Sequence, residues 1–250
     1  MTDSSYYEAY WKGVSGSEWT PSSGNATRDE KELFRKYLPP GACCLDYGCG
    51  NAKRYGLALA TSGVDYRGFD VSEHALAEAR AAGVNVNLLD ADGRTSLPDA
   101  TADTAICFEV LEHLMEPGRA LDELRRCVKP GGHVLVSVPN TANFIQRLEF
   151  LFTGFWCPGG SPHTARREPW RDPHIRFYNP HTLRRLLAEN GWEVVAFRGE
   201  RFFLCSLPIV WRKKEFHPCF NWLSLPFAWM GRVFPGLFSW RLFVVGRKAT

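Results

Sequence analysis

A turn built around two glycines, at residues 45–52 (L-D-Y-G-C-G-N-A), constrains the fold of this chain more than any other segment. Apolar residues before it are typical of a buried strand, and residues 54–62 after it read as a helix that ends at Gly63. Gly48 and Gly50 allow turn dihedrals and leave no side chain between the backbone and a ligand. Because a helix start also presents free N–H groups, the segment predicts a strand-turn-helix unit that binds a small molecule.

Acidic residues at two expected strand ends indicate the kind of ligand. Asp46 precedes the glycines and suits an ammonium group better than a pyrophosphate, and Lys53 stands near the place where dinucleotide-binding turns have a third glycine. Asp70 ends the next expected strand, 22 residues after Gly48, where a carboxylate can accept hydrogen bonds from ribose hydroxyls. The pattern therefore favours a ligand other than a dinucleotide.

Three segments resemble the class I S-adenosylmethionine (SAM) methyltransferases: D-x-G-C-G at 46–50, G-F-D-V-S at 68–72, and the run from Leu97 to Asn140. The resemblance covers about residues 40 to 200. It implies that SAM binds with its methionine part at the glycine turn, its ribose at the end of the second strand and its adenine after the third. The cofactor residues carried over in this way are Asp46, Gly48, Cys49, Gly50, Asp70, Val71, Asp90, Ala91, Asp92 and Glu109.

Strands alternate with helices along the chain, and this order predicts an α/β fold. We expect a Rossmann-like, doubly wound and mostly parallel seven-stranded sheet with helices on both faces. Ligands in such sheets bind outside the carboxyl ends of the strands, where the residues named above fall. The expected strands are 43–45, 66–70, 84–89, 104–108, 133–138, 193–197 and 240–247.

The chain divides into three expected parts: an aromatic arm and linker at 1–26, a SAM-binding core at 27–200, and an aromatic and basic segment with the last strand at 201–250. Within the core, residues 153–173 are rich in Gly, Pro and Arg and read as a substrate lid. In proteins that resemble this one, such an arm often folds over the cofactor, and packing on the domain surface is the open alternative. The arm's aromatic residues are Tyr6, Tyr7, Tyr10, Trp11 and Trp19.

Substrate chemistry is expected just after the fourth strand, at Glu109, Glu112 and His113. If a helical turn begins at Glu109, these side chains share one face and converge. Two carboxylates and an imidazole could bind a divalent metal such as Mg²⁺. The sequence therefore predicts an acidic, histidine-bearing acceptor site.

The E-x-x-E-H pattern resembles the motif of ubiquinone-biosynthesis O-methyltransferases and of small-RNA 3′-end 2′-O-methyltransferases, in which a metal grips substrate hydroxyls. The RNA family adds a P-N element and a later histidine, and Pro139-Asn140 and His174 stand at comparable places. Three roles stay open for the set: a metal site, a metal-free general base at His113 or His174, and a structural role. The candidate catalytic and metal-binding residues are Glu109, Glu112, His113 and His174.

Charge is unevenly distributed: residues 1–150 carry 15 basic and 21 acidic side chains (−6), and residues 151–250 carry 15 and 6 (+9). The basic half favours an anionic partner, with a solvated surface as the alternative. Residues 202–243 hold 12 aromatic side chains interleaved with Arg and Lys. This composition suits a membrane surface, a homodimer face or a wall over a hydrophobic substrate. Nucleic acid is the least favoured partner.

No signal-peptide pattern occurs in residues 1–19, and no run approaches the ~18 apolar residues of a membrane span. Eight scattered cysteines look like reduced thiols. We expect a cytoplasmic protein, with peripheral contact to the inner face of a membrane as an open alternative.

The expected activity is SAM-dependent O-methylation of a hydroxyl on a small, lipid-linked, aromatic or glycan acceptor. The protein would mainly position donor and acceptor and help to remove the hydroxyl proton. Two alternatives stay open: an RNA 2′-O-methyltransferase that uses a divalent metal, and a non-catalytic SAM-fold adaptor for a membrane or a protein.

Overall fold

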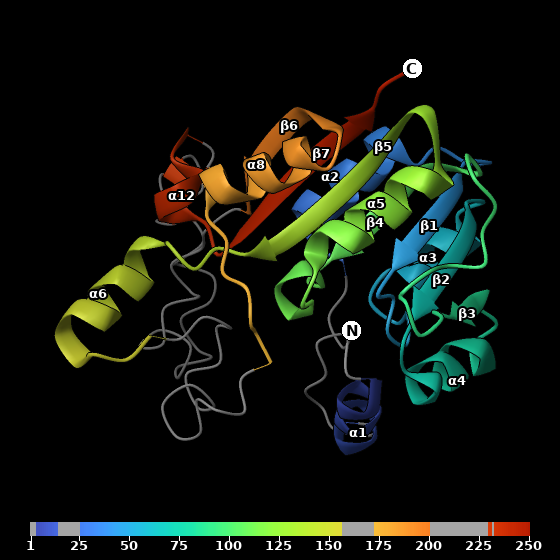
Figure 1. Cartoon of the computed structure of the whole chain (residues 1–250), viewed down its shortest axis with the longest axis horizontal. Helices are drawn as coiled ribbons and strands as arrows, with labels where there is room; N and C mark the ends of the chain where they lie inside the picture. Colours follow the sequence, from blue (N-terminus) through green and yellow to red (C-terminus); the bar gives the residue numbers. More distant parts are fainter. Residues whose placement is uncertain (1–3, 15–25, 157–172, 201–229, 232) are drawn as a thin grey trace, which may run out of the picture.

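The computed structural model describes residues 4–14, 26–156, 173–200, 230–231 and 233–250, and a seven-stranded sheet organises them (Figure 1). The strand order is β3-β2-β1-β4-β5-β7-β6, in which β7 is antiparallel to β5 and β6 and the other pairs are parallel. This topology confirms the predicted Rossmann-like α/β fold. The strands are β1 (Cys43–Tyr47), β2 (Asp65–Asp70), β3 (Val86–Leu88), β4 (Ala102–Phe108), β5 (Val128–Pro139), β6 (Trp192–Gly199) and β7 (Arg241–Lys248).

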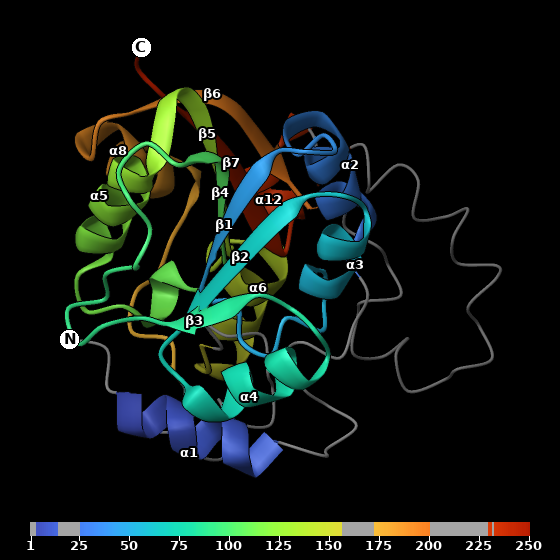
Figure 2. The ribbon, with the colours of Figure 1, turned by 90° about the vertical axis from the view of Figure 1, so that its right-hand side faces the viewer.

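Helices cover both faces of the sheet (Figure 2). On β4, Ala105 and Cys107 pack into a core shared with α5 and α8, whereas Ile106 and Phe108 pack into a core shared with α2, α3 and α4. Successive strand residues point to opposite faces, so a strand buried on both sides is apolar throughout. The helical elements are α1 (Ser4–Val14), α2 (Arg28–Tyr37), α3 (Gly56–Thr61), α4 (Glu73–Ala81), η1 (Leu111–His113), α5 (Pro117–Cys127), α6 (Phe144–Thr153), α8 (Pro180–Glu189) and α12 (Pro235–Phe238).

Local signals place most helix starts correctly. Thr27 and Glu30 form the predicted capping box of α2, with hydrogen bonds of 3.3 and 2.7 Å, and the Ser72 side chain caps α4. The helix predicted from residue 54 begins at Gly56 instead, because the chain makes turns between the glycines and that point. Boundaries of this kind are the least reliable part of a sequence-based assignment.

Three predicted features lie wholly or partly outside the described residues. These are Trp19 of the arm, residues 157–172 of the expected lid, and most of the aromatic segment at 202–243. The described part of the arm is helix α1. Within the described residues, every helix is too short or too polar to cross a bilayer.

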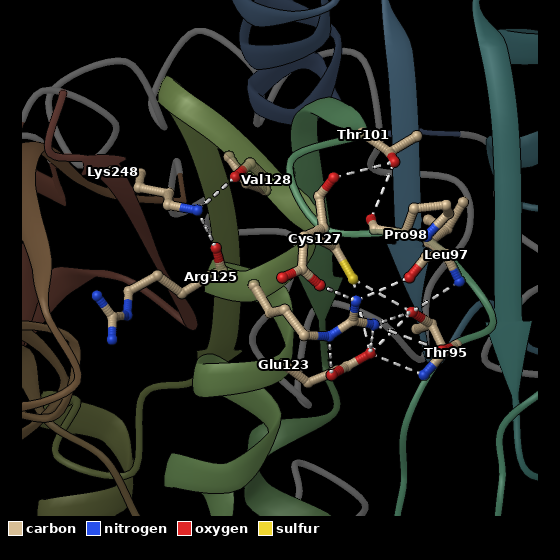
Figure 3. Close-up of polar contacts among 11 residues, drawn as sticks. Thr95, Leu97, Pro98, Thr101, Glu123, Arg125, Cys127, Val128 and Lys248 are labelled. Atoms are coloured by element: carbon tan, nitrogen blue, oxygen red, sulfur yellow. Dashed lines mark hydrogen bonds and ion pairs between the residues drawn. The ribbon is translucent and has the colours of Figure 1, made fainter.

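A buried polar network attaches the loop between β3 and β4 to helix α5 (Figure 3). Glu123 accepts hydrogen bonds from the backbone N–H and the hydroxyl of Thr95, each at 2.8 Å, and from Nε and Nη2 of Arg126, at 2.9 and 2.7 Å. Arg126 also donates to the Leu97 carbonyl at 2.9 Å. Burial opposes ionisation of Glu123, but the hydrogen bonds from Arg126 and Thr95 outweigh it and lower its pKa to about 2.

This network makes the stability of the fold depend on pH. Because the folded-state pKa of Glu123 is lowered, its stabilisation is present above about pH 4.5 and is lost as the pH falls toward 2. We expect Glu123→Gln to reduce the free energy of unfolding by about 1–3 kcal/mol near neutral pH, and by less at about pH 3.5. Urea unfolding at both pH values measures this difference. The exposed neighbour Asp122 provides the control, since Asp122→Asn should leave both values unchanged.

Candidate active site

The glycine turn lies where β1 and β2 end side by side. The backbone N–H groups of Gly48 and Cys49 both donate to the Phe69 carbonyl, at 2.7 and 3.0 Å, which holds the turn against β2. Gly48 and Gly50 have φ values of 78° and 54°, so both need the freedom of glycine. A Cβ atom at Gly48 would collide with Val110, which follows β4. The turn is therefore enclosed by the ends of three neighbouring strands.

Asp70 is buried beneath this turn. One of its carboxylate oxygens accepts from the Gly50 N–H at 2.8 Å, and the other accepts from the Ser72 N–H at 3.0 Å. Burial raises the pKa of Asp70, and the backbone donors oppose that rise. The carboxylate thus ties the glycine turn to the start of α4.

The Asp46 carboxylate is also buried, and it accepts hydrogen bonds from two tyrosines. The hydroxyls of Tyr55 and Tyr66 donate to it, at 3.3 and 2.5 Å. Burial raises the pKa of Asp46 to about 7, against the effect of these two hydrogen bonds. Sequence reasoning missed both tyrosines, because neither stands in a recognised motif.

The residues predicted near the adenine form an exposed turn after β3. The Asp90 carboxylate accepts from the N–H groups of Asp92 and Arg94, at 2.9 and 2.7 Å, so the turn is held by its own acid. Tyr47, at the end of β1, donates to the Gly93 carbonyl at 2.9 Å. This bond brings Asp90, Ala91 and Asp92 to the same edge of the sheet as Asp46.

The predicted convergence of Glu109 with Glu112 and His113 on one helical face is wrong. Glu109 has a φ of 55°, so no helix begins there, and the short turn η1 begins two residues later. The Glu109 carboxylate accepts from the Ser137 hydroxyl at 2.7 Å. After burial, which raises the pKa of Glu109, the largest influence is the guanidinium of Arg241, which lowers it.

Glu112, His113 and His174 do come together, although 60 residues separate the two histidines. Their ligand atoms lie within 4.8 Å of one another, and the Nε2 atoms of His113 and His174 are 3.8 and 3.9 Å from one Glu112 oxygen. Glu112 is 1% exposed, and neither of its oxygens has a hydrogen-bond partner among the described residues. Burial, and then the charge of Glu109, raise its pKa well above the usual range.

The backbone around His174 fixes this cluster. The N–H groups of Ile175 and Arg176 donate to the Glu112 carbonyl, at 2.9 and 3.0 Å, which joins this segment to η1. His113 Nδ1 lies 3.1 Å from the Pro173 carbonyl. Because a carbonyl only accepts, Nδ1 carries a proton, and in the neutral ring Nε2 is therefore unprotonated.

Asn140, predicted from the P-N element, has a different environment. Its side-chain amide donates to the carbonyls of Pro235, Gly236 and Ser239, at 2.9 to 3.2 Å. It therefore anchors α12 to the end of β5, and it does not join the histidine cluster.

Comparison with known proteins agrees with this geometry. The chain matches a family described as "Methyltransferase domain" over residues 24–196. Ubiquinone biosynthesis O-methyltransferase of Paraburkholderia phymatum is 36% identical over 150 residues, which are 57% of this chain and 61% of that protein. The enzyme of the same name from Azoarcus sp. is 30% identical over 195 residues, which are 72% of this chain and 79% of that protein. The chain thus spans under two thirds of the length of the first relative.

A solved structure has a similar fold. The complex of the Haloferax volcanii Trm112 methyltransferase activator with a methyltransferase matches with a TM-score of 0.59 and 18% identity, covering 100% of this chain and 98% of that one. At this identity the likeness concerns the fold alone. The family match, however, extends from before α2 into β6 and includes the glycine turn, Asp70 and the Glu112 cluster. The chain therefore belongs to the class I SAM-dependent methyltransferases.

Proposed function

We propose that this protein transfers the methyl group of SAM to a hydroxyl oxygen of a small, lipid-linked, aromatic or glycan acceptor. The buried Glu112 carboxylate, which faces two imidazoles, is the observation that carries the proposal. Burying a carboxylate without a hydrogen-bond donor is costly, so such a group is expected where a cation or a hydroxyl completes the site. The relatives named as O-methyltransferases also favour an oxygen acceptor.

The glycine turn and the two neighbouring strand ends would hold the cofactor. Gly48 and Gly50 allow the backbone to approach the methionine part, and Asp70 would accept hydrogen bonds from the ribose hydroxyls. Asp90 and Asp92 would border the adenine. Bound SAM supplies a methyl group activated by a sulfonium, which leaves the protein to bind, to orient and to handle one proton.

Asp46 acts on the cofactor through the shape and charge of the turn. Its carboxylate is held by Tyr55 and Tyr66, and it lies directly before the glycines. This arrangement fixes an acidic group, with a pKa raised to about 7, below the place proposed for the methionine ammonium. The carboxylate would favour the cationic form of that amine without direct contact.

The Glu112 cluster fits a divalent cation. Glu112, His113 and His174 would hold the ion, since their ligand atoms lie within 4.8 Å of one another. Nδ1 of His113 is held by a carbonyl, as is usual for a metal-binding histidine. With Glu109 outside the set, one carboxylate and two imidazoles suit Mn²⁺ or Zn²⁺ better than Mg²⁺.

The same residues can prepare a hydroxyl for transfer. The oxygen supplies the electron pair of the new O–C bond, the electrons of the broken C–S bond stay on sulfur, and the hydroxyl proton leaves. Nε2 of His113 or His174 can accept that proton when no metal occupies the cluster. Bound metal would supply a positive charge that makes the hydroxyl more acidic.

The first test concerns the cofactor site. Asp70→Asn removes a charged acceptor that we propose for the ribose, and a hydrogen bond to a charged group contributes about 1.5–3 kcal/mol. We expect the Kd for SAM, measured by calorimetry, to rise at least tenfold. Asp122→Asn, at an exposed position of α5, should bind SAM as the wild type does. Wild-type affinity in the Asp70 variant would refute the ribose assignment.

The second test separates the acceptor site from the cofactor site. Glu112→Gln keeps the shape of the side chain and removes its charge, so SAM affinity should stay unchanged while the rate of methyl transfer falls about a hundredfold. Glu116→Gln, exposed on the adjoining loop, is the matched control. Transfer at the wild-type rate in the Glu112 variant would remove this residue from the proposed mechanism.

The third test identifies the acceptor class. Host extract is incubated with the protein and methyl-labelled SAM, with and without EDTA, and then separated into organic, aqueous small-molecule and nucleic-acid fractions. We expect label in a non-nucleic-acid fraction, and we expect EDTA to abolish it because the cluster binds a metal. Label in nucleic acid would instead support the RNA 2′-O-methyltransferase. EDTA-resistant labelling would support a histidine base without metal.

A further inference from the structure

Helix α1 contacts three parts of the proposed site that are far apart in the sequence. The Trp11 indole packs on Gly50, so closely that a Cβ atom there would lie 2.5 Å from the ring. The Glu8 carboxylate accepts from the Ser72 hydroxyl at 2.8 Å and from the His74 N–H at 3.1 Å. Figure 2 shows α1 alongside α4, at the end of the sheet where β2 leads into α4. The helix therefore covers the cofactor side of the site.

Tyr7, on the same helix, reaches the acceptor side. Its ring is half-buried and meets the His113 ring edge-on, with 5.9 Å between the ring centres. Burial is the main cause that raises the pKa of Tyr7, and the charges of Tyr6, Glu112 and Asp70 raise it further. Tyr7 thus lies near both the proposed ribose carboxylate and the acceptor carboxylate.

Access to the cofactor site depends on α1. With α1 in place, Asp70 is only 7% exposed, and Trp11 is 9% exposed above the glycine turn. Because α1 packs on Gly50 and Ser72, whose N–H groups both donate to Asp70, a ligand as large as SAM reaches this carboxylate only when α1 moves. Glu8 alone makes two hydrogen bonds from α1 to the start of α4, so loss of this one side chain would loosen the helix.

We propose that Tyr7 is a further substrate-contacting residue, carried by α1 into the space between SAM and the acceptor, and that Glu8 holds α1 closed on α4. The acceptor half of this inference rests on the proposed function. The closed helix places an aromatic ring beside the proposed site of the sulfonium, an arrangement that attracts a cation. The Tyr7 hydroxyl then orients the acceptor hydroxyl beside His113.

The proposed closure of α1 over SAM is tested in the absence of a methyl acceptor. The full-length protein is loaded with labelled SAM and chased with excess unlabelled SAM, and the dissociation rate is measured. We expect Glu8→Ala and Tyr7→Ala to increase this rate about tenfold, since each removes a contact that keeps α1 closed. Tyr6→Phe is the matched control, because Tyr6 is 40% exposed, and it should dissociate SAM as the wild type does.

The Tyr7 hydroxyl is tested by the conservative change. Tyr7→Phe keeps the ring contact with His113, so SAM should dissociate at the wild-type rate while label transfer into host extract at saturating SAM falls about tenfold. A merely structural role would leave transfer by this variant unchanged, and that result would overturn the acceptor contact. If both alanine variants released SAM at the wild-type rate, the proposal that α1 closes over SAM would be wrong.

The two proposals can fail separately. If Glu112→Gln transfers label at the wild-type rate, the acceptor site proposed above is wrong, whereas the dissociation rates of the Glu8 and Tyr7 variants still decide whether α1 closes over SAM. Circular dichroism of each variant confirms that it is folded before either rate is compared.

Discussion

The buried carboxylate of Asp70 is the interaction on which the site depends. By accepting from Gly50 and Ser72, it joins the turn after β1 to the helix that follows β2. Helix α1 then packs against both ends of this link, through Trp11 on Gly50 and Glu8 on Ser72. A change at Asp70 would therefore move the turn and the start of α4, and with them the surface on which α1 rests.

Much of the fold could be predicted because it follows from local rules. Strands buried on both faces show continuous apolar runs, and glycine is required where φ is positive, as at Gly48 and Gly50. Parallel pairing places Asp46 opposite Gly68, so two acids that end neighbouring strands necessarily lie near each other. The closeness of these two acids was accordingly foreseeable from sequence.

The remaining features depend on contacts between distant parts of the chain. Asn140 is engaged by carbonyls 95 to 99 residues away, and no pattern near Asn140 indicates them. The sequence of α1 gives a partial indication of its role, because Tyr7 and Trp11 are four residues apart and share one face of the helix. The strands or helices on which that face would pack could not be read from this spacing.

The two glutamates of the E-x-x-E-H motif, Glu109 and Glu112, lie in different environments, although the sequence suggested one shared site. Glu109, at a positive φ, lies near Arg241, whose guanidinium also binds Glu30 and Glu200, so the fold supplies a fixed cation beside it. Glu112, three residues later, faces two imidazoles and has its pKa raised further by the charge of Glu109. Because Arg241 balances the charge of Glu109, Glu112 is the carboxylate that we propose for an external cation or hydroxyl. Our proposal therefore assigns the chemistry of the acceptor to Glu112 and its two histidines.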